Sequence, residues 1–242
     1  MSVLRTAAVA SIALALGCQP APRPAPPAPA AALRSASAAL AVLVRRETET
    51  RTLTAMFSIL VQRADGSGES SRGAVVVARP DRLRLQIFQF GVMTAYDYTV
   101  NGDRYRVRQP LAGEQRIGRF GEPGRGESEA MGEDLRPLFL ADGSLAGAEV
   151  SETAESFVVS LGAADARREI EILKRDGRIV REAAYAGEAP KLVVEYGDYR
   201  DVAGLAMPFA IAVSYPARSI TLRIAVTRYT RNEPVDPKLF EL

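Results

Sequence analysis

Most of the chain from residue 53 onward alternates between apolar and polar residues with a period of two, the pattern of a β-strand with one buried face. In the first run, residues 53–62, Phe57 and Ile59 lie on the apolar side. Similar runs recur as far as residue 230, separated by turn sequences such as Asn101-Gly102. The pattern predicts about ten or eleven strands joined mainly by hairpins.

Two segments have helical rather than strand spacing. Residues 33–46 place their leucines on one stripe, which predicts an amphipathic helix. Residues 128–140 predict a second helix, which Pro137 would bend or shorten. The glycine-rich stretch at 118–127 is expected to be a flexible connection.

These elements predict a mainly β (α+β) fold, a strongly curved antiparallel half-barrel with a helical lid over an apolar cavity. A cavity is expected because so large a sheet has more apolar surface than two short helices cover. The alternative is a core filled completely by side chains. The residues expected to line the cavity are Phe57, Ile59, Leu83, Leu85, Ile87, Leu135 and Phe139.

The N-terminus has the pattern of an exported protein. Arg5 precedes an apolar run, residues 6–16, that has the length of a signal-peptide core and is too short to span a bilayer. Gly17 and Cys18 come next. This arrangement resembles the bacterial lipobox, after which the signal is removed and the cysteine is acylated, although the two residues before Gly17 depart from the usual motif. The alternative is a signal peptide followed by an ordinary buried cysteine.

The segment after Cys18 favours lipidation. Residues 19–32 are rich in proline and alanine, which predicts an extended spacer and not a fold in which a cysteine could be buried. At about 3.1 Å per residue the spacer would reach roughly 40 Å. The chain therefore divides into a signal peptide (1–17), a lipidated cysteine with its spacer (18–32) and one folded domain (33–242).

Composition narrows the classes of function. Histidine is absent and Cys18 is the only cysteine, which excludes His-based triads, His-containing zinc sites and, once Cys18 is acylated, thiolate chemistry. The 31 basic and 29 acidic residues are interspersed, so the chain does not have the charge pattern of a nucleic-acid-binding protein. Tyr96, Asp97 and Tyr98 are adjacent, but strand alternation places Asp97 on the face opposite to both tyrosines. We therefore expect no enzyme activity, no cofactor and no metal.

Four short segments, in this order, resemble the LolA/LolB-like proteins. Residues 73–85 combine a glycine, a strand, Arg-Pro and Leu-Arg-Leu, and residues 100–105 form an Asn-Gly-Asp hairpin. Residues 199–208 follow the pattern Tyr-x-x-x-x-Gly-x-x-x-Pro, and residues 232–240 start with Asn-x-Pro and end in phenylalanine. Each motif is ordinary turn and strand chemistry, so the resemblance depends on their order along nearly the whole domain.

The resemblance implies a half-open barrel that holds lipids or acylated proteins in its concavity. The lipobox favours the LolB-like members, which are outer-membrane lipoproteins that receive acylated cargo, here with a soluble LolA-like carrier as a possible partner. LolB-like proteins carry a leucine before a glycine at a protruding hairpin tip that aids delivery to the membrane. In this sequence Phe90, Gly91, Val92 and Met93 occupy that place, with phenylalanine instead of leucine. The alternative is that these side chains pack under the rim of the sheet.

The leading hypothesis is a lipid-anchored protein on the periplasmic side of the bacterial outer membrane that binds acyl chains or lipoproteins. Gln19 after the cysteine, rather than aspartate, favours the outer membrane by the same resemblance. The competing hypothesis is a structural or assembly lipoprotein of the cell envelope that uses the same fold as a protein-docking surface. An enzyme acting on lipid or glycan ranks last.

Overall fold

The computed structural model describes residues 32–90, 93–122, 136, 139–140, 145, 147–163 and 166–242. The N-terminal helix is α1 (Ala36–Thr48), and two short 3₁₀ helices are η1 (Pro216–Arg218) and η2 (Pro237–Phe240). The strands are β1 (Thr52–Arg63), β2 (Gly68–Ala78), β3 (Arg82–Gln89), β4 (Met93–Asn101), β5 (Arg104–Gln109), β6 (Glu114–Arg119), β7 (Glu149–Glu152), β8 (Ser156–Leu161), β9 (Arg168–Leu173), β10 (Ile179–Ala186), β11 (Ala189–Val202), β12 (Leu205–Tyr215) and β13 (Ile220–Arg231).

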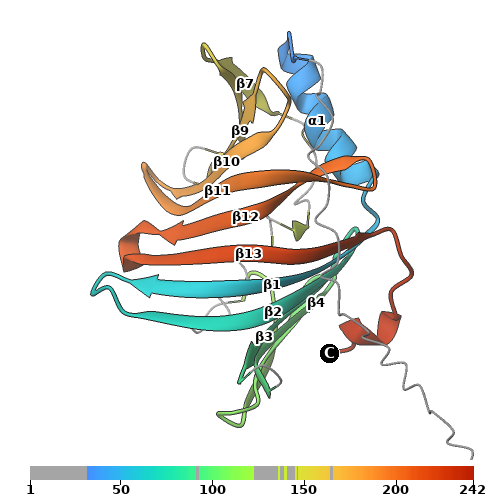
Figure 1. The fold of residues 1–242 in the computed structure, drawn as a ribbon, viewed down its shortest axis with the longest axis vertical. Coiled ribbons are helices and arrows are strands. Elements are labelled where there is room, and N and C mark those ends of the chain that lie inside the picture. Colours follow the sequence, from blue (N-terminus) through green and yellow to red (C-terminus); the bar gives the residue numbers. More distant parts are fainter. Residues whose placement is uncertain are drawn as a thin grey trace, which may run out of the picture.

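All of these strands belong to one antiparallel sheet, in the order β6-β5-β4-β3-β2-β1-β13-β12-β11-β10-β9-β8-β7. Every neighbouring pair is a sequential hairpin except β1 and β13, which join the first and last strands in the middle of the sheet. The sheet is strongly curved and does not close, because β6 and β7 are its free edges (Figure 1). The predicted fold class, a mainly β half-barrel, is confirmed.

Within the described residues the sheet has thirteen strands, more than the ten or eleven expected. The strand that the pattern did not reveal is β6, whose residues Glu114, Gln115 and Arg116 carry no apolar alternation. Backbone pairing with β5 forms this edge strand, and Gly118 leaves room for the ring of Tyr105: a Cβ on Gly118 would lie 2.6 Å from the tyrosine hydroxyl. The predicted flexible connection therefore begins later than residue 118.

The inner face of the sheet is built by the predicted alternation. In β1, Ala55, Phe57 and Ile59 are buried while the residues between them are at least partly exposed. The ring of Phe57 lies against Gly73 of β2, where an added Cβ would come within 2.4 Å of the ring. A glycine at this position thus lets an aromatic side chain lie flat on the neighbouring strand.

The N-terminal helix forms where the leucine stripe predicts it. The Ser35 hydroxyl accepts a hydrogen bond from the Ala38 backbone N–H at 3.2 Å and caps the helix, and Arg45 and Arg46 in the last turn complement the helix dipole. The second predicted helix, 128–140, lies mainly outside the described residues.

The C-terminal motif that begins at Asn232 closes the fold beside β1. Asn232 has a left-handed backbone, with φ 58°. Its side-chain oxygen accepts from the Arg51 backbone N–H at 2.8 Å, and its Nδ2 donates to the Glu49 carbonyl, also at 2.8 Å. Beyond it, η2 lies against β3 and β4, with Phe240 only 1 % exposed (Figure 1). The motif is therefore a clamp between the chain end and the entry to β1.

Candidate ligand-binding face

The inner face of the sheet is apolar across most of its width. One row of directly paired residues crosses it from β8 to β1: Val159, Ile170, Glu182, Val194, Val213, Leu222 and Val61. Directly paired residues share a face, and at about 4.8 Å per strand the row is roughly 29 Å long. Glu182 is the one charged residue of this row.

The residues predicted to line a cavity lie together on this face. Six of the seven form or contact one apolar cluster: Phe57, Ile59, Leu83, Leu85, Ile87 and Phe139. The first four are buried, whereas Ile87 and Phe139 are partly exposed. Leu135 lies outside the described residues. The structure thus brings strands β1 and β3 and the chain near Phe139 to one surface, and whether a ligand enters it stays a prediction.

Helix α1 covers a different part of the inner face. Ala39 and Leu43 pack into a second cluster with Phe157, Val159 and Ile172, which come from β8 and β9. Figure 1 shows α1 at the β7–β10 end of the sheet. The first cluster, on β1–β5 and β11–β13, does not include a residue of α1 among those described. As a lid, α1 therefore covers only the β8–β10 side of the face.

Three charged residues, which we call the charged triad, lie at the boundary between the two clusters: Glu182, Arg46 and Arg168. Tyr196 lies beside them. The Glu182 carboxylate accepts hydrogen bonds from Arg46 Nη1 at 3.3 Å, from Tyr196 Oη at 2.9 Å and from Arg168 Nη2. Arg46 comes from α1, and the other three residues come from β9, β10 and β11. These bonds connect the helix to the sheet.

The electrostatics keep Glu182 ionised. Burial alone would raise the pKa of this carboxyl, but Arg168, Arg46 and the hydrogen bonds lower its pKa further than burial raises it. Burial and the neighbouring Glu182 both raise the pKa of Tyr196, which therefore stays protonated and donates its hydrogen bond. Burial is the largest single effect and acts to lower the pKa of Arg46, but Glu182, Tyr196 and Tyr199 together outweigh it and the net shift is upward. Two cations around one carboxylate leave the triad with a net positive charge.

The sequence pattern did not reveal the charged triad, because a bulge hides it. Alternation counted from Ile179 would place Arg181 on the inner face and Glu182 on the outer face. The register between β10 and β9 shifts between Ile179 and Arg181, so that both Ile179 and Glu182 lie inside. No local residue marks this bulge.

The predicted hairpin tip projects into solvent. Phe90 is 86 % exposed and has a left-handed backbone, with φ 51°, and Met93 is 47 % exposed. Leu111, in the neighbouring β5–β6 turn, is also 47 % exposed. We call Phe90, Met93 and Leu111 the apolar tip. Gly91 and Val92 lie outside the described residues.

The cluster Tyr96–Asp97–Tyr98 is divided between the two faces, as alternation predicts. Asp97 is 2 % exposed and binds Arg84 through two hydrogen bonds, Nε–Oδ1 at 3.0 Å and Nη2–Oδ2 at 2.7 Å. Tyr98 belongs to the apolar cluster of the inner face. The three side chains therefore do not form a site together.

Neither a metal site nor a membrane-spanning helix occurs within the described ranges. No group of three His, Cys, Asp or Glu side chains there is arranged to hold a metal ion. None of the helices there combines the length and the hydropathy needed to span a bilayer.

Solved structures with this topology identify the fold. A LolA superfamily protein of Nitrosomonas europaea superposes with a TM-score of 0.61 at 10 % identity, over 86 % of this chain and 98 % of that one. A DUF1329 family protein of Desulfovibrio piger gives a TM-score of 0.62 at 13 % identity, covering 85 % and 96 %. The chain has the LolA/LolB-like fold.

A third structure of this LolA/LolB-like fold is a domain described as an outer-membrane lipoprotein-sorting protein, from Vibrio parahaemolyticus. It superposes with a TM-score of 0.58 at 11 % identity, over 85 % of this chain and 97 % of that one. No protein-family model matches the sequence, and no curated protein matches it either. At such low identity the likeness establishes the fold alone, and it confirms the architecture that the ordered motifs imply.

Proposed function

We propose that this chain is a lipid-anchored protein of the bacterial envelope that binds acyl chains or lipoproteins on its inner face, as a LolB-like receptor or lipid carrier. The observation that carries the proposal is the wide apolar inner face of an open sheet, of which α1 covers only one side. The likeness to an outer-membrane lipoprotein-sorting domain supports the same class of function. Binding, and not catalysis, is the role that this face supports.

The proposed anchor at Cys18 would hold this activity at a membrane. Acylation of Cys18 and a spacer of roughly 40 Å would hold the domain on the periplasmic side of the outer membrane, within reach of a soluble LolA-like carrier. Stable anchoring needs two acyl chains, or one chain with a second membrane contact. The apolar tip is the surface that would meet the membrane or the acylated cargo.

The ligand is tested by introducing a polar side chain on the inner face. Ile87→Gln changes a partly exposed residue there, and Met56→Gln makes a comparable change at a 42 % exposed residue of the outer face. Lipids that copurify with each full-length protein are measured by mass spectrometry, and affinity is measured with a fluorescent fatty acid. We expect Ile87→Gln to weaken binding about tenfold and Met56→Gln to leave it unchanged. A chain that copurifies with no lipid and does not bind the probe would exclude the proposal.

The anchor is tested separately with Cys18→Ser. We expect the native chain to incorporate labelled palmitate and to remain with the outer-membrane fraction, and the variant to do neither. Equal incorporation by the two chains would show that Cys18 is not the acylation site, without bearing on what the inner face binds.

The alternative function is protein docking by an envelope assembly protein, and the observation that favours it is the exposure of the apolar tip. Replacing Phe90 and Met93 with aspartate puts charge on the tip and leaves the inner face intact. If this variant no longer captures a protein partner in a pull-down but still binds the fatty acid as the native chain does, docking is favoured. Loss of lipoprotein transfer to vesicles with no change in partners would favour the receptor.

A further inference from the structure

The outer face of the sheet carries a dense group of arginines at its β3–β6 end. Alternation places every second residue of these strands outside, and arginine is the most frequent residue at those positions, although β4 contributes none. Six residues make up this surface, which we call the arginine face: Arg82, Arg84, Arg104, Arg106, Arg108 and Arg119. They lie in rows across neighbouring strands, about 10 Å apart from β3 to β5.

Little of this charge is neutralised. The one acidic residue within the arginine face is Asp97, which is buried and bound to Arg84. Arg119 reaches Asp103 of the adjacent turn at 3.7 Å, with both side chains more than half exposed. Within the described part of the chain, Arg82, Arg104 and Arg108 make no ion pair. Guanidinium groups without an acidic partner, gathered on one face of the sheet, attract an anionic partner.

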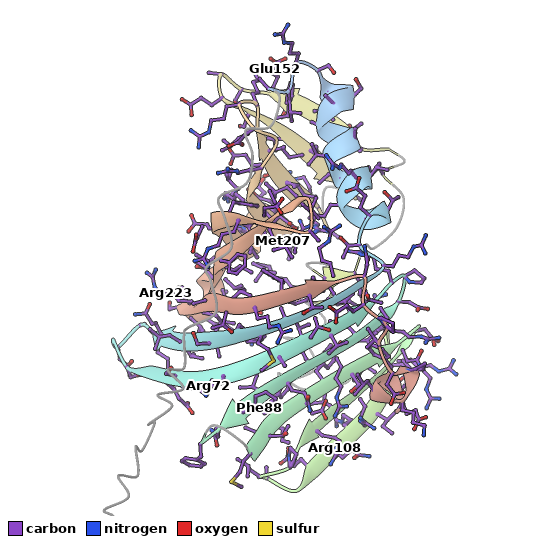
Figure 2. All side chains as sticks on the ribbon, turned by 45° about the vertical axis from the view of Figure 1, so that its right-hand side comes forward. Arg72, Phe88, Arg108, Glu152, Met207 and Arg223 are labelled. Atoms are coloured by element: carbon purple, nitrogen blue, oxygen red, sulfur yellow. The ribbon has the colours of Figure 1, made fainter. Side chains whose placement is uncertain are left out.

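The opposite end of the outer face is mixed in charge: Arg181 pairs with both Glu171 and Glu195, and Arg167 forms an ion pair with Glu169 at 3.1 Å. Glu149 of β7, Glu169 and Glu171 of β9 and Glu195 of β11 point outward there, as their register with the inner-face residues requires. Figure 2 shows the two ends of the sheet, with Arg108 on the lower strands and Glu152 at the far upper edge. A charge difference across one face orients the domain in the field of an anionic surface.

The apolar tip lies at one end of these strands, nearest to Arg108, whereas Arg82, Arg104 and Arg119 lie in one row at the other end. Arg72 pairs with Phe88 on the outer face of β2 and β3, and Phe88 leads into the exposed Phe90 (Figure 2). Met93 and Leu111 extend the apolar tip over the adjacent hairpins. At the tip end, Arg72 and Arg108 thus lie near exposed apolar side chains, which is the chemistry of a membrane interface. An acidic protein surface would be matched by the arginines alone.

We propose that the arginine face docks the domain on a bilayer that contains anionic phospholipids, with the apolar tip entering the interface beside it. The arginines would bind lipid phosphates, and the end of the outer face with mixed charge would point away from the bilayer. This inference concerns the orientation of the domain on the membrane, and it holds whatever ligand the inner face binds.

The test is vesicle binding by the full chain carrying Cys18→Ser, so that no acyl chain at that position contributes. The vesicles are phosphatidylcholine with or without phosphatidylglycerol. The test variant is Arg82→Gln/Arg104→Gln/Arg108→Gln, because none of these arginines makes an ion pair that the fold would lose. The control is Arg34→Gln/Arg175→Gln/Arg228→Gln, which removes the same charge from exposed residues outside the arginine face.

We expect binding only to the anionic vesicles, and a decrease in binding as salt rises from about 0.05 to 0.5 M. Each arginine near an anionic surface raises the affinity for the membrane about fivefold. The test variant should therefore bind the anionic vesicles about 100-fold more weakly than the native chain, and the control less than about threefold more weakly. Fatty-acid binding should be unchanged in both, which separates this result from the proposed ligand.

Three results would overturn the proposal. One is equal binding of the native chain to neutral and anionic vesicles. Another is an equal loss in the test variant and the control, which would indicate net charge and not this face. The third is binding of the arginine face to a soluble acidic polypeptide with no binding to vesicles, which would assign the face to a protein partner.

Discussion

The charged triad should contribute strongly to stability, and Glu182→Gln tests this. The substitution keeps the size of the side chain but leaves Arg46 and Arg168 without their carboxylate. Removing one partner of a buried ion pair costs about 3–5 kcal/mol. Glu182 is 2 % exposed, but the side chains of Arg46 and Arg168 are 30 % and 22 % exposed and can turn partly toward water. We therefore expect a loss of about 2–3 kcal/mol in the free energy of unfolding.

The assay is urea unfolding at neutral pH, supported by thermal melting. For a domain of this size the expected loss corresponds to a melting temperature lower by about 4–10 °C. The matched control is Glu49→Gln, which removes the same charge from the exposed i,i+4 pair with Arg45, 2.8 Å apart, at the end of the same helix. That change should cost less than about 0.5 kcal/mol. If Glu182→Gln costs no more than Glu49→Gln, the triad does not hold α1 on the sheet.

The same residue predicts a dependence on pH. The pKa of Glu182 is lowered below its ordinary value of 4.5, so the unfolded chain binds its proton more readily than the folded one. The stability from this carboxylate is therefore fully present above about pH 5 and is lost as the pH falls through the lower folded pKa. The difference in unfolding free energy between the native chain and Glu182→Gln should be constant near neutral pH and should shrink below about pH 4. A difference that grows in acid would refute the assigned direction.

Three further substitutions test the packing and the surface. Gly73→Ala should destabilise the fold by about 1–3 kcal/mol, because its Cβ would meet the Phe57 ring at 2.4 Å. The control is Gly197→Ala, whose Cβ would meet only one side chain, at 3.9 Å, and which should change the free energy of unfolding by less than about 0.5 kcal/mol. Similar unfolding midpoints for the two variants would contradict this packing. Asn232→Ala removes two hydrogen bonds of 2.8 Å and should cost about 1–2 kcal/mol in denaturant unfolding, so an unchanged midpoint would show that they do not stabilise the C-terminal clamp. Phe90→Ser should leave the melting temperature unchanged, since the side chain is 86 % exposed, and should weaken vesicle binding; a clear loss of stability would mean that the tip packs against the domain.

Several parts of the fold follow from local chemistry. Alternation identifies the buried sides of β1 and β3 because a half-buried strand must place every second residue in the core. The turn at Asn101-Gly102 follows from the left-handed backbone that glycine adopts there, with φ 64°. The exposed Phe90 follows from the apolar residues in a hairpin tip, although the sequence left open whether they project or fold back.

Other parts depend on pairings between distant segments. The edge strand β6 exists because β5 offers it backbone partners, and its own polar residues do not indicate a strand. The inward position of Glu182 depends on one bulge, and its ionisation depends on Arg168 and on Arg46, the latter more than a hundred residues earlier in the chain. Neither the position of Glu182 nor its ionisation can be predicted from the neighbouring residues in the sequence, because register shifts and long-range ion pairs are properties of the assembled sheet.

The sequence by itself determined the class of the domain, the apolar side of most strands, the helix at the N-terminus and the absence of histidine chemistry, because these depend on residue type and spacing over a few residues. Only the tertiary structure decided that β1 and β13 join the two halves of the sheet, that α1 covers one side of the inner face, and that six arginines from β3, β5 and β6 share one outer surface. These features arise from the register of the sheet, which brings residues far apart in the chain onto common faces.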